Sequence, residues 1–299
     1  MKIVTYNIQY GSGKDGRIDL GRIAQAVDGA DVIALQEVDR NWRRSGMTDQ
    51  VAELTALLNG YHWVYGPYFD VDASTRDADG NLTNRRRQFG AMLLSKTPIL
   101  SSRLLYLPKS ATVERHNMQT GAVEGVIEAS GRAVRFYSLH LAARWRRDRL
   151  LQIGALLDIV RRAPLEGGTW TGQHPHRDWQ ENDETSPPMP EDAILLGDFN
   201  FVSTAPEYDV LAGPLDGEGG RLAYQEGLVD SWVAAGHEEG EGVTLPADPS
   251  FGYTRGRRLD YAFVTKSLAN RVRSAEVDME AQGSDHQPFW IDIDWEADG

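Results

Sequence analysis

Short apolar runs recur along the chain, and polar residues that can do chemistry follow several of them. The clearest run, at residues 194–196, leads through Gly197 to Asp198 and Asn200. In an extended chain, residues two apart point to the same side, so the carboxyl group and the amide can face one ligand. The alternative interpretation is a strand that simply ends in an Asp/Asn turn.

The spacing of apolar residues predicts the secondary structure of the rest of the chain. Compact runs predict strands at about 2–8, 31–35, 62–66, 90–95, 122–128, 133–139, 259–264, 271–277 and 288–294. Roughly helical spacing predicts helices with apolar faces at Ile18, Ile23 and Val27, at Val51, Leu54 and Leu58, at Leu150, Ile153, Leu157 and Val160, and a short helix from Glu207 to Leu211. Ser130 and Gly131 are expected to turn a hairpin, and Thr48 or Asp49 to cap the second helix.

Polar segments between these elements are expected at the surface. Residues 70–88 carry four aspartates and then three consecutive arginines. A solvated loop is the simpler interpretation, although loops beside active sites often select substrates. Residues 164–192 are rich in Pro, Gly and acidic residues, which predicts a long surface excursion. No linker separates two units, so we expect one domain over residues 1–299.

The composition excludes several kinds of chemistry. The chain of 299 residues is 41% hydrophobic, which suffices for a core, and it contains no cysteine. Thiolate sites are therefore excluded, and carboxylate, amide and imidazole groups remain as ligands for a hard metal ion. No run of about 18 apolar residues is present. Met1 leads straight into the first strand rather than into a signal peptide, so a cytoplasmic location is expected.

The net charge of −13 bears on the partner. Nonspecific binding of nucleic acid depends on clustered Lys and Arg, so the charge disfavours a nucleic-acid substrate. An acidic protein needs a metal ion or a local basic patch to hold a phosphate group.

Polar residues stand at or just past the ends of several expected strands. They are Asn7, Glu37, His140, Asp198, Asn200, Asp260 and the triplet Ser284-Asp285-His286. Ligands collect where strand ends converge, so side chains that are distant in sequence can form one site. Each residue alone has an ordinary structural explanation, but the repeated pattern favours a shared site.

Six short motifs occur in the order seen in one enzyme family. They are Thr5-Tyr6-Asn7, Leu35-Gln36-Glu37, Ser138-Leu139-His140-Leu141, Gly197-Asp198-Phe199-Asn200, Arg258-Leu259-Asp260-Tyr261 and Ser284-Asp285-His286. From residue 3 to about 290, the chain resembles the endonuclease/exonuclease/phosphatase family. The resemblance implies an α/β fold, a four-layered sandwich of two mainly antiparallel sheets packed face to face with helices outside. It also implies hydrolysis of phosphoesters that depends on Mg²⁺ or Mn²⁺.

The chemistry of these residues fits such a reaction. Magnesium prefers oxygen ligands and needs few protein carboxylates. We therefore expect Glu37 first and Asp285 second as metal ligands, with the amide oxygen of Asn7 in support. Asp198 is expected to orient the attacking water and is able to deprotonate it. Asn200 is expected to donate hydrogen bonds to the phosphate.

His140 and His286 are the expected donors to the developing negative charge. The resemblance pairs His286 with Asp260, and a carboxylate on one imidazole nitrogen fixes the tautomer and favours the cation. The sequence leaves open whether Asp198 or His286 takes the proton from water.

Substrate recognition is the least determined part. Nucleases of the family often place a tyrosine and a second acid before the first histidine, and the candidates here are Tyr65, Tyr68, Asp70 and Asp72. Four arginines within residues 144–149 are either the solvated start of a helix or a basic group. In the second case, Arg144 or Arg146 recognises an anionic headgroup or a second phosphate. Family members often carry an arginine just before the hairpin, which makes Arg115 another candidate.

The preferred substrate class is a small phosphodiester, a phospholipid headgroup or a sugar phosphate. Nuclease action on DNA or RNA is the main alternative, because an acidic protein can have a locally basic site. A non-catalytic binding module is a further alternative. Such a module is expected to have lost Glu37, Asp198 or His286, and all three are present. The sequence does not determine monoesterase or diesterase action, the number of metal ions or the oligomeric state.

Overall fold

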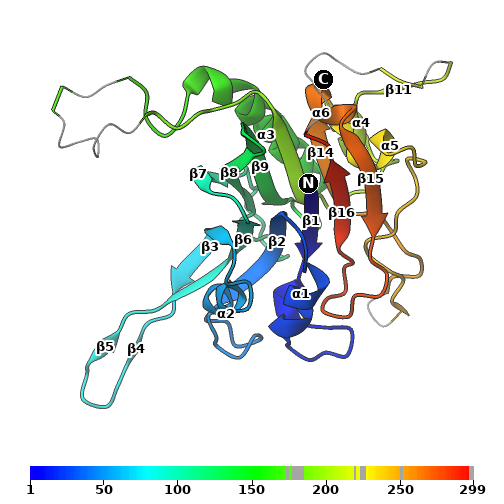
Figure 1. Ribbon diagram of the computed structural model, residues 1–299. Helices are drawn as coiled ribbons and strands as arrows, with labels where there is room; N and C mark the ends of the chain where they lie inside the picture. The colour runs from blue at the N-terminus through cyan, green and yellow to red at the C-terminus, as the bar shows by residue number, and fades with distance from the viewer. Residues whose placement is uncertain (173–174, 177–184, 219, 223–226, 250–251, 296–299) are drawn as a thin grey trace.

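The computed structural model describes residues 1–172, 175–176, 185–218, 220–222, 227–249 and 252–295. Within these residues, two sheets of six strands each pack face to face (Figure 1). The first sheet has the order β15 (Val272–Val277), β16 (Phe289–Ile293), β1 (Lys2–Asn7), β2 (Val32–Arg40), β6 (Arg86–Ser95) and β3 (His62–Asp72). The second has the order β13 (Leu228–Asp230), β14 (Asp260–Thr265), β10 (Ala193–Asp198), β9 (Arg132–His140), β8 (Gly121–Ala129) and β7 (Ile99–Tyr106).

The remaining elements are helices and short hairpins. The helices are η1 (Gln9–Gly11), α1 (Leu20–Ala26), α2 (Gln50–Leu57), α3 (Arg146–Glu166), α4 (Pro206–Ala212), α5 (Ser231–Ala234) and α6 (Lys266–Ala269). The short pairs are β4 (Thr75–Arg76) with β5 (Leu82–Thr83), and β11 (Leu215–Asp216) with β12 (Gly220–Arg221). None of the helices in the described part of the chain has the length and apolar character needed to cross a membrane.

The central strands are buried on both faces, which explains why they appear in the sequence as continuous apolar runs. In β10, Ile194 and Leu196 pack between the two sheets, whereas Ala193 and Leu195 pack in the cluster that contains α3 and α4. On the other side, α1 and α2 pack against the outer face of the first sheet. The four-layered sandwich is thereby confirmed. Each sheet is mixed, with β1 parallel to β2 and β9 parallel to β10.

The predicted helices form, with differences at Ile18 and in α3. Ile18 precedes α1 and is 41% exposed, so its prediction as part of an apolar face is wrong. Asp49 caps α2 by accepting a hydrogen bond from the backbone nitrogen of Ala52 at 3.2 Å. In α3, Leu150 is 36% exposed, so its prediction as part of the apolar face is wrong. Arg149 is buried in its place, because its Nε donates to the fully buried Glu207 at 2.9 Å.

Residues 70–88, predicted as a solvated loop, instead extend the sheet as an arm. Strands β3 and β6 continue to pair as far as Asp72 and Arg86, and β4 and β5 pair beyond them. The arm projects from the end of the molecule toward which β1 runs (Figure 1). We did not predict β7, an edge strand whose buried and exposed positions alternate only partly.

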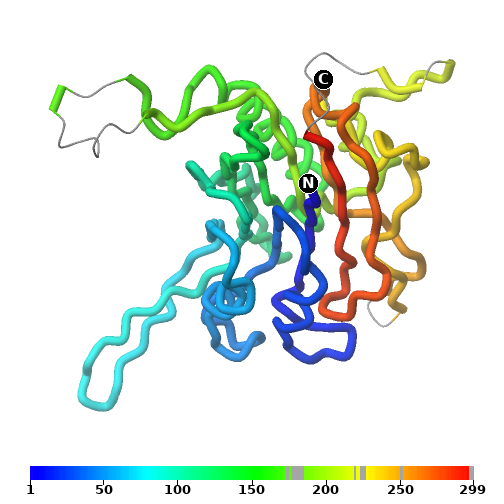
Figure 2. Tube along the Cα trace, viewed as in Figure 1, coloured from blue at the N-terminus to red at the C-terminus, as the bar shows by residue number. Residues whose placement is uncertain are grey.

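The excursion predicted at residues 164–192 begins inside α3, which continues to Glu166 and ends at Gly167. Residues 173–174 and 177–184 of this segment lie outside the described residues. The described residues that follow α3 leave the body at the end opposite to the arm (Figure 2).

Candidate active site

Three strands of the second sheet bring polar residues into one row. Asp198, the last residue of β10, lies opposite His140, the last of β9, and Asp260, the first of β14. Side chains alternate between the faces of a strand, and Asp198 follows Leu196 on the face that packs against the other sheet. Gly197 keeps the strands close here, since a Cβ on it would lie 2.0 Å from the backbone oxygen of the neighbouring β9. The row therefore sits at the end of the interface between the sheets.

The first sheet supplies Asn7 and Glu37 to the same place. Asn7, the last residue of β1, donates from Nδ2 to Glu37 Oε1 and to Asp198 Oδ2, both at 3.1 Å. Simple alternation would put Glu37 on the same face as Leu35, toward the helices. A register shift between Leu35 and Val38, with φ at +62° for Glu37, turns this carboxyl toward Asn7.

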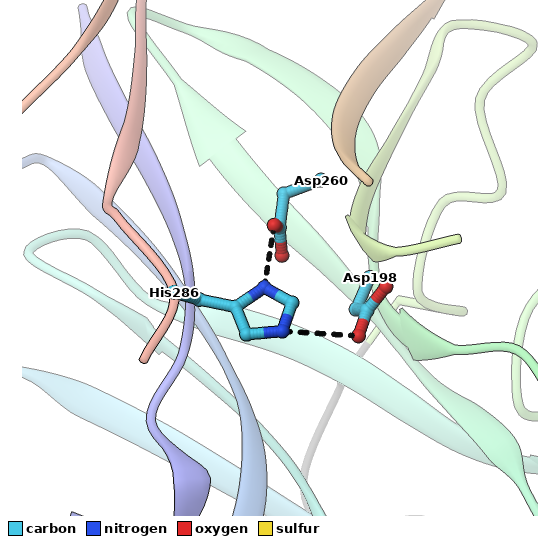
Figure 3. A group of neighbouring side chains, drawn as sticks. All are labelled: Asp198, Asp260 and His286. Carbon is cyan, nitrogen blue, oxygen red and sulfur yellow. Dashed lines mark hydrogen bonds and ion pairs between the residues drawn. The ribbon is translucent and has the colours of Figure 1, made fainter. Parts of the chain in front are cut away.

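His286, in the segment before β16, lies between two carboxylates (Figure 3). Its Nδ1 is 2.7 Å from Asp260 Oδ2, and its Nε2 is 3.8 Å from Asp198 Oδ2. Burial by itself lowers the pKa of His286, but the charges of Asp260 and Asp198 outweigh this and raise the pKa well above its usual value. Burial also raises the pKa of the Asp198 carboxyl, although the charge of His286 opposes it.

These side chains, with His140 and Asp285, form one group that is called the cluster below. Unlike His286, His140 makes no hydrogen bond with a carboxylate of this cluster. Its Nε2 is 3.7 Å from Asp198 Oδ2 and 4.0 Å from Glu37 Oε1. Its Nδ1 is buried and has no hydrogen-bond partner in the described part of the chain. No carboxylate therefore fixes the tautomer of His140, in contrast to His286.

Asp285 is connected to the cluster through Gln9. Its Oδ2 accepts a hydrogen bond from Gln9 Nε2 at 2.9 Å, and the backbone nitrogen of Gln9 donates to Asn7 Oδ1 at 3.0 Å. Burial raises the pKa of Glu37, and the negative charge of Asp285 adds to this rise. The result is a connected set of oxygen donors, Asn7, Glu37 and Asp285, in which Glu37 and Asp285 carry the negative charge.

A second group of possible metal ligands consists of Asp198, Asp260 and His286, whose ligand atoms lie within 4.8 Å of one another. The hydrogen bond to Asp260 occupies Nδ1 of His286, so this group is better described as a His–Asp pair facing a third carboxyl. A hard cation prefers the oxygen donors of Glu37, Asp285 and Asn7.

Comparison with known proteins identifies the family of the chain. A model of the Endonuclease/Exonuclease/phosphatase family matches residues 4–286. The chain belongs to this family. Its members are generally phosphoester hydrolases. No curated protein has a significant match to the sequence.

Solved structures share the fold at low sequence identity. An endonuclease/exonuclease/phosphatase from Beutenbergia cavernae is 21% identical, with a TM-score of 0.66, over 97% of this chain and 70% of that one. A mannosyl-6-phosphatase from Bacteroides thetaiotaomicron is 17% identical, with a TM-score of 0.61, over 99% of this chain and 100% of that one. A humanized D. rerio TDP2 is 18% identical, with a TM-score of 0.56, over 97% of both chains.

Of the two tyrosines that the sequence left open, Tyr68 is the one buried beside Glu37 and Asp198. Its side chain is 1% exposed, and its hydroxyl has no partner among the described residues. Burial raises the pKa of Tyr68, and the neighbouring Glu37 contributes. Tyr65 instead donates to the backbone of Val38, and Asp70 pairs with Arg86 in the arm. Gly66 and Tyr68 are the buried positions of β3, but residues 63–69 are nearly all apolar or aromatic, so the sequence alone did not distinguish the two faces.

Asn200 follows Asp198 in a left-handed conformation, with φ at +56°. Its backbone nitrogen donates to Asp198 Oδ1 at 2.8 Å, and its Nδ2 donates to Leu141 O at 3.1 Å. One hydrogen of this amide remains for a ligand.

No hydrogen bond or ion pair between described residues connects the three predicted arginines to the cluster. Arg144 and Arg115 are exposed. The Nε of Arg146 lies 3.8 Å from Glu207 Oε2, on the side of α4.

Arg44, which sequence reasoning missed, lies closer to the cluster. Its Nε and Nη2 donate to the buried carboxylate of Asp39 at 2.9 and 2.8 Å. Its guanidinium carbon is 4.3 Å from the centre of the Trp42 ring and 4.4 Å from that of Tyr10. Burial lowers the pKa of Arg44, but Asp39 and then Glu37 raise it overall. No motif in the sequence indicated this residue.

Proposed function

We propose that this chain hydrolyses phosphoesters with the help of Mg²⁺ or Mn²⁺, by in-line attack of water on phosphorus. The observation that carries the proposal is the environment of Asp198. One buried carboxyl is surrounded by the amide of Asn7 at 3.1 Å and by imidazole nitrogens of His140 and His286 at 3.7 and 3.8 Å. Such a group can orient a water and accept its proton beside donors for the developing charge.

Asp198 and His286 divide the proton chemistry in this proposal. Because burial raises its pKa, the Asp198 carboxylate is a stronger base than an ordinary aspartate. It takes the proton of the attacking water on Oδ2. His286 stays protonated because Asp260 holds its Nδ1, so Nε2 can donate to a phosphate oxygen. His140, Asn200 and the free hydroxyl of Tyr68 add neutral or charged donors to the same phosphate.

Glu37, Asp285 and Asn7 are the proposed holders of the cation. Their donor atoms are oxygens, which Mg²⁺ and Mn²⁺ prefer. The raised pKa of Glu37 reflects burial and a neighbouring carboxylate, and both effects are offset when a cation is bound. A bound cation would neutralise negative charge on the phosphate oxygens.

The proposed substrate is a small phosphodiester or the phosphate of a lipid headgroup. The net charge of −13 works against a polyanion. The arm adds no net positive charge, since residues 70–88 carry four aspartates and four arginines. The mannosyl-6-phosphatase with the same fold is consistent with a small phosphorylated substrate. Cleavage of DNA or RNA is the alternative that the experiment must separate.

The first experiment measures hydrolysis of bis-p-nitrophenyl phosphate and nicking of supercoiled plasmid, each with Mg²⁺, Mn²⁺ or EDTA. We expect metal-dependent turnover of the small diester and intact plasmid. The variant Asp198→Asn serves as the control for a contaminating enzyme, and we expect it to lose nearly all turnover.

Each result has a distinct meaning. Plasmid nicking that Asp198→Asn abolishes would favour the nuclease alternative. Turnover that is unchanged in EDTA would contradict the metal dependence. Absence of turnover on both substrates would contradict phosphodiesterase action and favour a binding module or a narrow monoesterase.

A further inference from the structure

A cavity of about 340 Å³ opens beside the cluster. One wall comes from the turn after β1, with Gln9, Tyr10 and Lys14, and the other comes from the segment between α5 and β14, with Leu245 and Tyr253. The proposed reaction does not use this cavity. Pockets that bind small organic ligands have volumes of about 300–1,000 Å³, so the space suits one small organic group.

The cavity shares Asp285 with the proposed metal site, and Gln9 connects the two. Asp285 and Gln9 line it, and the hydrogen bond of 2.9 Å between them forms part of the boundary. Gln9 is also bound to Asn7 Oδ1 through its backbone nitrogen. A phosphate bound through a cation at Asn7, Glu37 and Asp285 would therefore lie next to this cavity, within reach of an organic group placed in it.

The lining combines flat rings with apolar side chains. Tyr10 and Tyr253 supply the rings, and Leu245, Pro246 and Ala247 supply apolar surface. Each ring is also covered by a guanidinium group, Arg44 at 4.4 Å from Tyr10 and Arg257 at 4.6 Å from Tyr253. Rings of this kind favour stacked or edge-on contact with another flat ring.

The turn that carries Tyr10 is fixed before any ligand binds. Gln9 and Tyr10 are consecutive left-handed residues, with φ at +43° and +46°. Such conformations persist only where the surrounding structure enforces them. The buried Gln50 does so by donating from Nε2 to the backbone oxygen of Tyr10 at 2.7 Å. The ring wall is therefore pre-organised, which reduces the entropic cost of binding.

Lys14 is the one cationic side chain in the described lining of the cavity. It is exposed, and its ammonium group makes no hydrogen bond or ion pair with the described residues, whereas the backbone nitrogen of Lys14 donates to Gln282 O at 3.2 Å. Asp248, which also lines the cavity, is engaged in an interaction within the protein. An acceptor or anionic group on a ligand would therefore find Lys14 available.

We propose that this cavity binds the organic group of the phosphoester substrate, a flat ring that carries a negative charge. The ring lies against Tyr10 and Tyr253, and the charge lies at Lys14. The inference rests on the proposed function in that the cluster holds the phosphate.

The test compares the binding of two phosphate monoesters by calorimetry with Mg²⁺ present. Phenyl phosphate and methyl phosphate share the phosphate group and differ in the ring. We expect phenyl phosphate to bind roughly tenfold more tightly, since ring contacts add to the burial of apolar surface. In Tyr253→Ala this advantage should fall below about threefold, while Tyr253→Phe should retain it. Tyr106→Ala, which changes a 61% exposed tyrosine on β7, is the matched control.

A second comparison tests the charge. We expect 4-carboxyphenyl phosphate to bind roughly threefold more tightly than phenyl phosphate, as is typical of an exposed ion pair. Lys14→Gln should remove this difference. Lys96→Gln should preserve it, because Lys96 pairs with Asp31 at the opposite end of the first sheet.

Two outcomes would overturn the inference. In one, wild-type protein binds phenyl and methyl phosphate equally. In the other, Tyr253→Ala weakens both ligands by the same factor, which indicates a general loss of structure. Because these measurements need no turnover, they are separate from the proposed function. A protein that binds the ring but hydrolyses no diester would retain the cavity inference and lose the proposed phosphodiesterase.

Discussion

Two of the buried clusters of charged and polar side chains in the described part of the chain differ in how completely their hydrogen-bonding groups are used. One, in the second sheet, contains Arg103, Glu124, Arg135 and Tyr137. Arg103 donates two hydrogen bonds to the Glu124 carboxylate, at 2.7 and 2.8 Å. Each guanidinium nitrogen of Arg135 donates to an oxygen, among them Tyr137 Oη at 2.9 Å.

The other cluster is the candidate active site, where groups remain unpaired. His140 Nδ1 and Asp260 Oδ1 are buried without a partner in the described part of the chain. Burial and crowding raise the pKa values of Glu37 and Asp198. Buried charge alone therefore does not mark a reactive site. Unused donors and acceptors next to crowded carboxylates do, because they can still engage a substrate.

The largest expected effect is a loss of activity in a variant of the candidate active site that remains folded. His286→Ala should lower kcat for bis-p-nitrophenyl phosphate by about 10²–10⁴-fold, because it removes the charged donor beside Asp198. Because the substitution also leaves Asp260 buried without its partner, the rates are compared well below the unfolding transition of each protein. His62→Ala, an exposed histidine at the start of β3, should leave kcat and the urea midpoint unchanged. Activity of His286→Ala within tenfold of wild type would show that this residue has been assigned the wrong role.

The converse effect is expected in the fully paired cluster. Glu124→Ala leaves Arg103 and Tyr137 without their shared acceptor, and breaking such a buried pair should lower the free energy of unfolding by about 3 kcal/mol. Urea denaturation measures this change, and kcat below the unfolding transition should be preserved. Glu128→Ala, an exposed glutamate on the same strand, is the control. A selective fall in kcat would mean that this cluster also serves the reaction.

A smaller effect concerns pH. The charge of Asp260 raises the pKa of His286, so Asp260→Asn should lower it. The loss of activity at alkaline pH, where the imidazolium deprotonates, should then begin at lower pH. Because the folded pKa of His286 lies above its usual value near about 6.5, its contribution to stability is complete below that pH and disappears as the pH rises through the folded pKa.

In Asp260→Asn, the pH range over which charged His286 stabilises the folded protein should be narrower. Rate profiles and urea midpoints between pH 6 and pH 10, taken on both proteins, measure the two effects. An alkaline limb at the same pH in both proteins would contradict the pairing of His286 with Asp260 as the source of its charge.

The smallest expected effect separates two sets of arginines. Arg44 is held by Asp39 and two rings, so it can bind an anion with little further ordering, whereas Arg144 is exposed and unconstrained. Arg44→Ala should raise KM for an anionic diester roughly threefold to tenfold with little change in kcat. Arg144→Ala combined with Arg146→Ala should raise it by less. A larger rise in KM for the double variant than for Arg44→Ala would indicate that the start of α3 recognises the substrate.

The strand ends could be read from the sequence because each is a local pattern, an apolar run followed by a polar residue. This was sufficient to select Asn7, Asp198, Asp260 and His286, which the structure brings together, whereas the layers of the fold were expected only from the resemblance to the family. The orientation of Glu37 depends on a bulge against β6, which is a non-local feature. Arg44 was missed for a similar reason, because its role depends on the ring of Tyr10 and on a buried carboxylate.

Leu150 shows the same limit in a helix. Helical spacing placed it on the apolar face, but the buried Glu207 draws Arg149 inward. A partner from another part of the chain can thus reverse what local periodicity favours. The arm is a further case, since pairing of β3 with β6 extends through residues whose composition is typical of a loop.

The row of His140, Asp198 and Asp260 limits how natural variation can alter the length of this chain. A single inserted or deleted residue within β9, β10 or β14 would turn one of these side chains toward the opposite face of its sheet. Insertions in the arm or after α3 leave the row intact. Evolution is therefore free to change the number of residues between the motifs, and constrained to keep the number within each strand. Distant relatives should be recognisable by rigid spacing inside each motif and variable spacing between motifs.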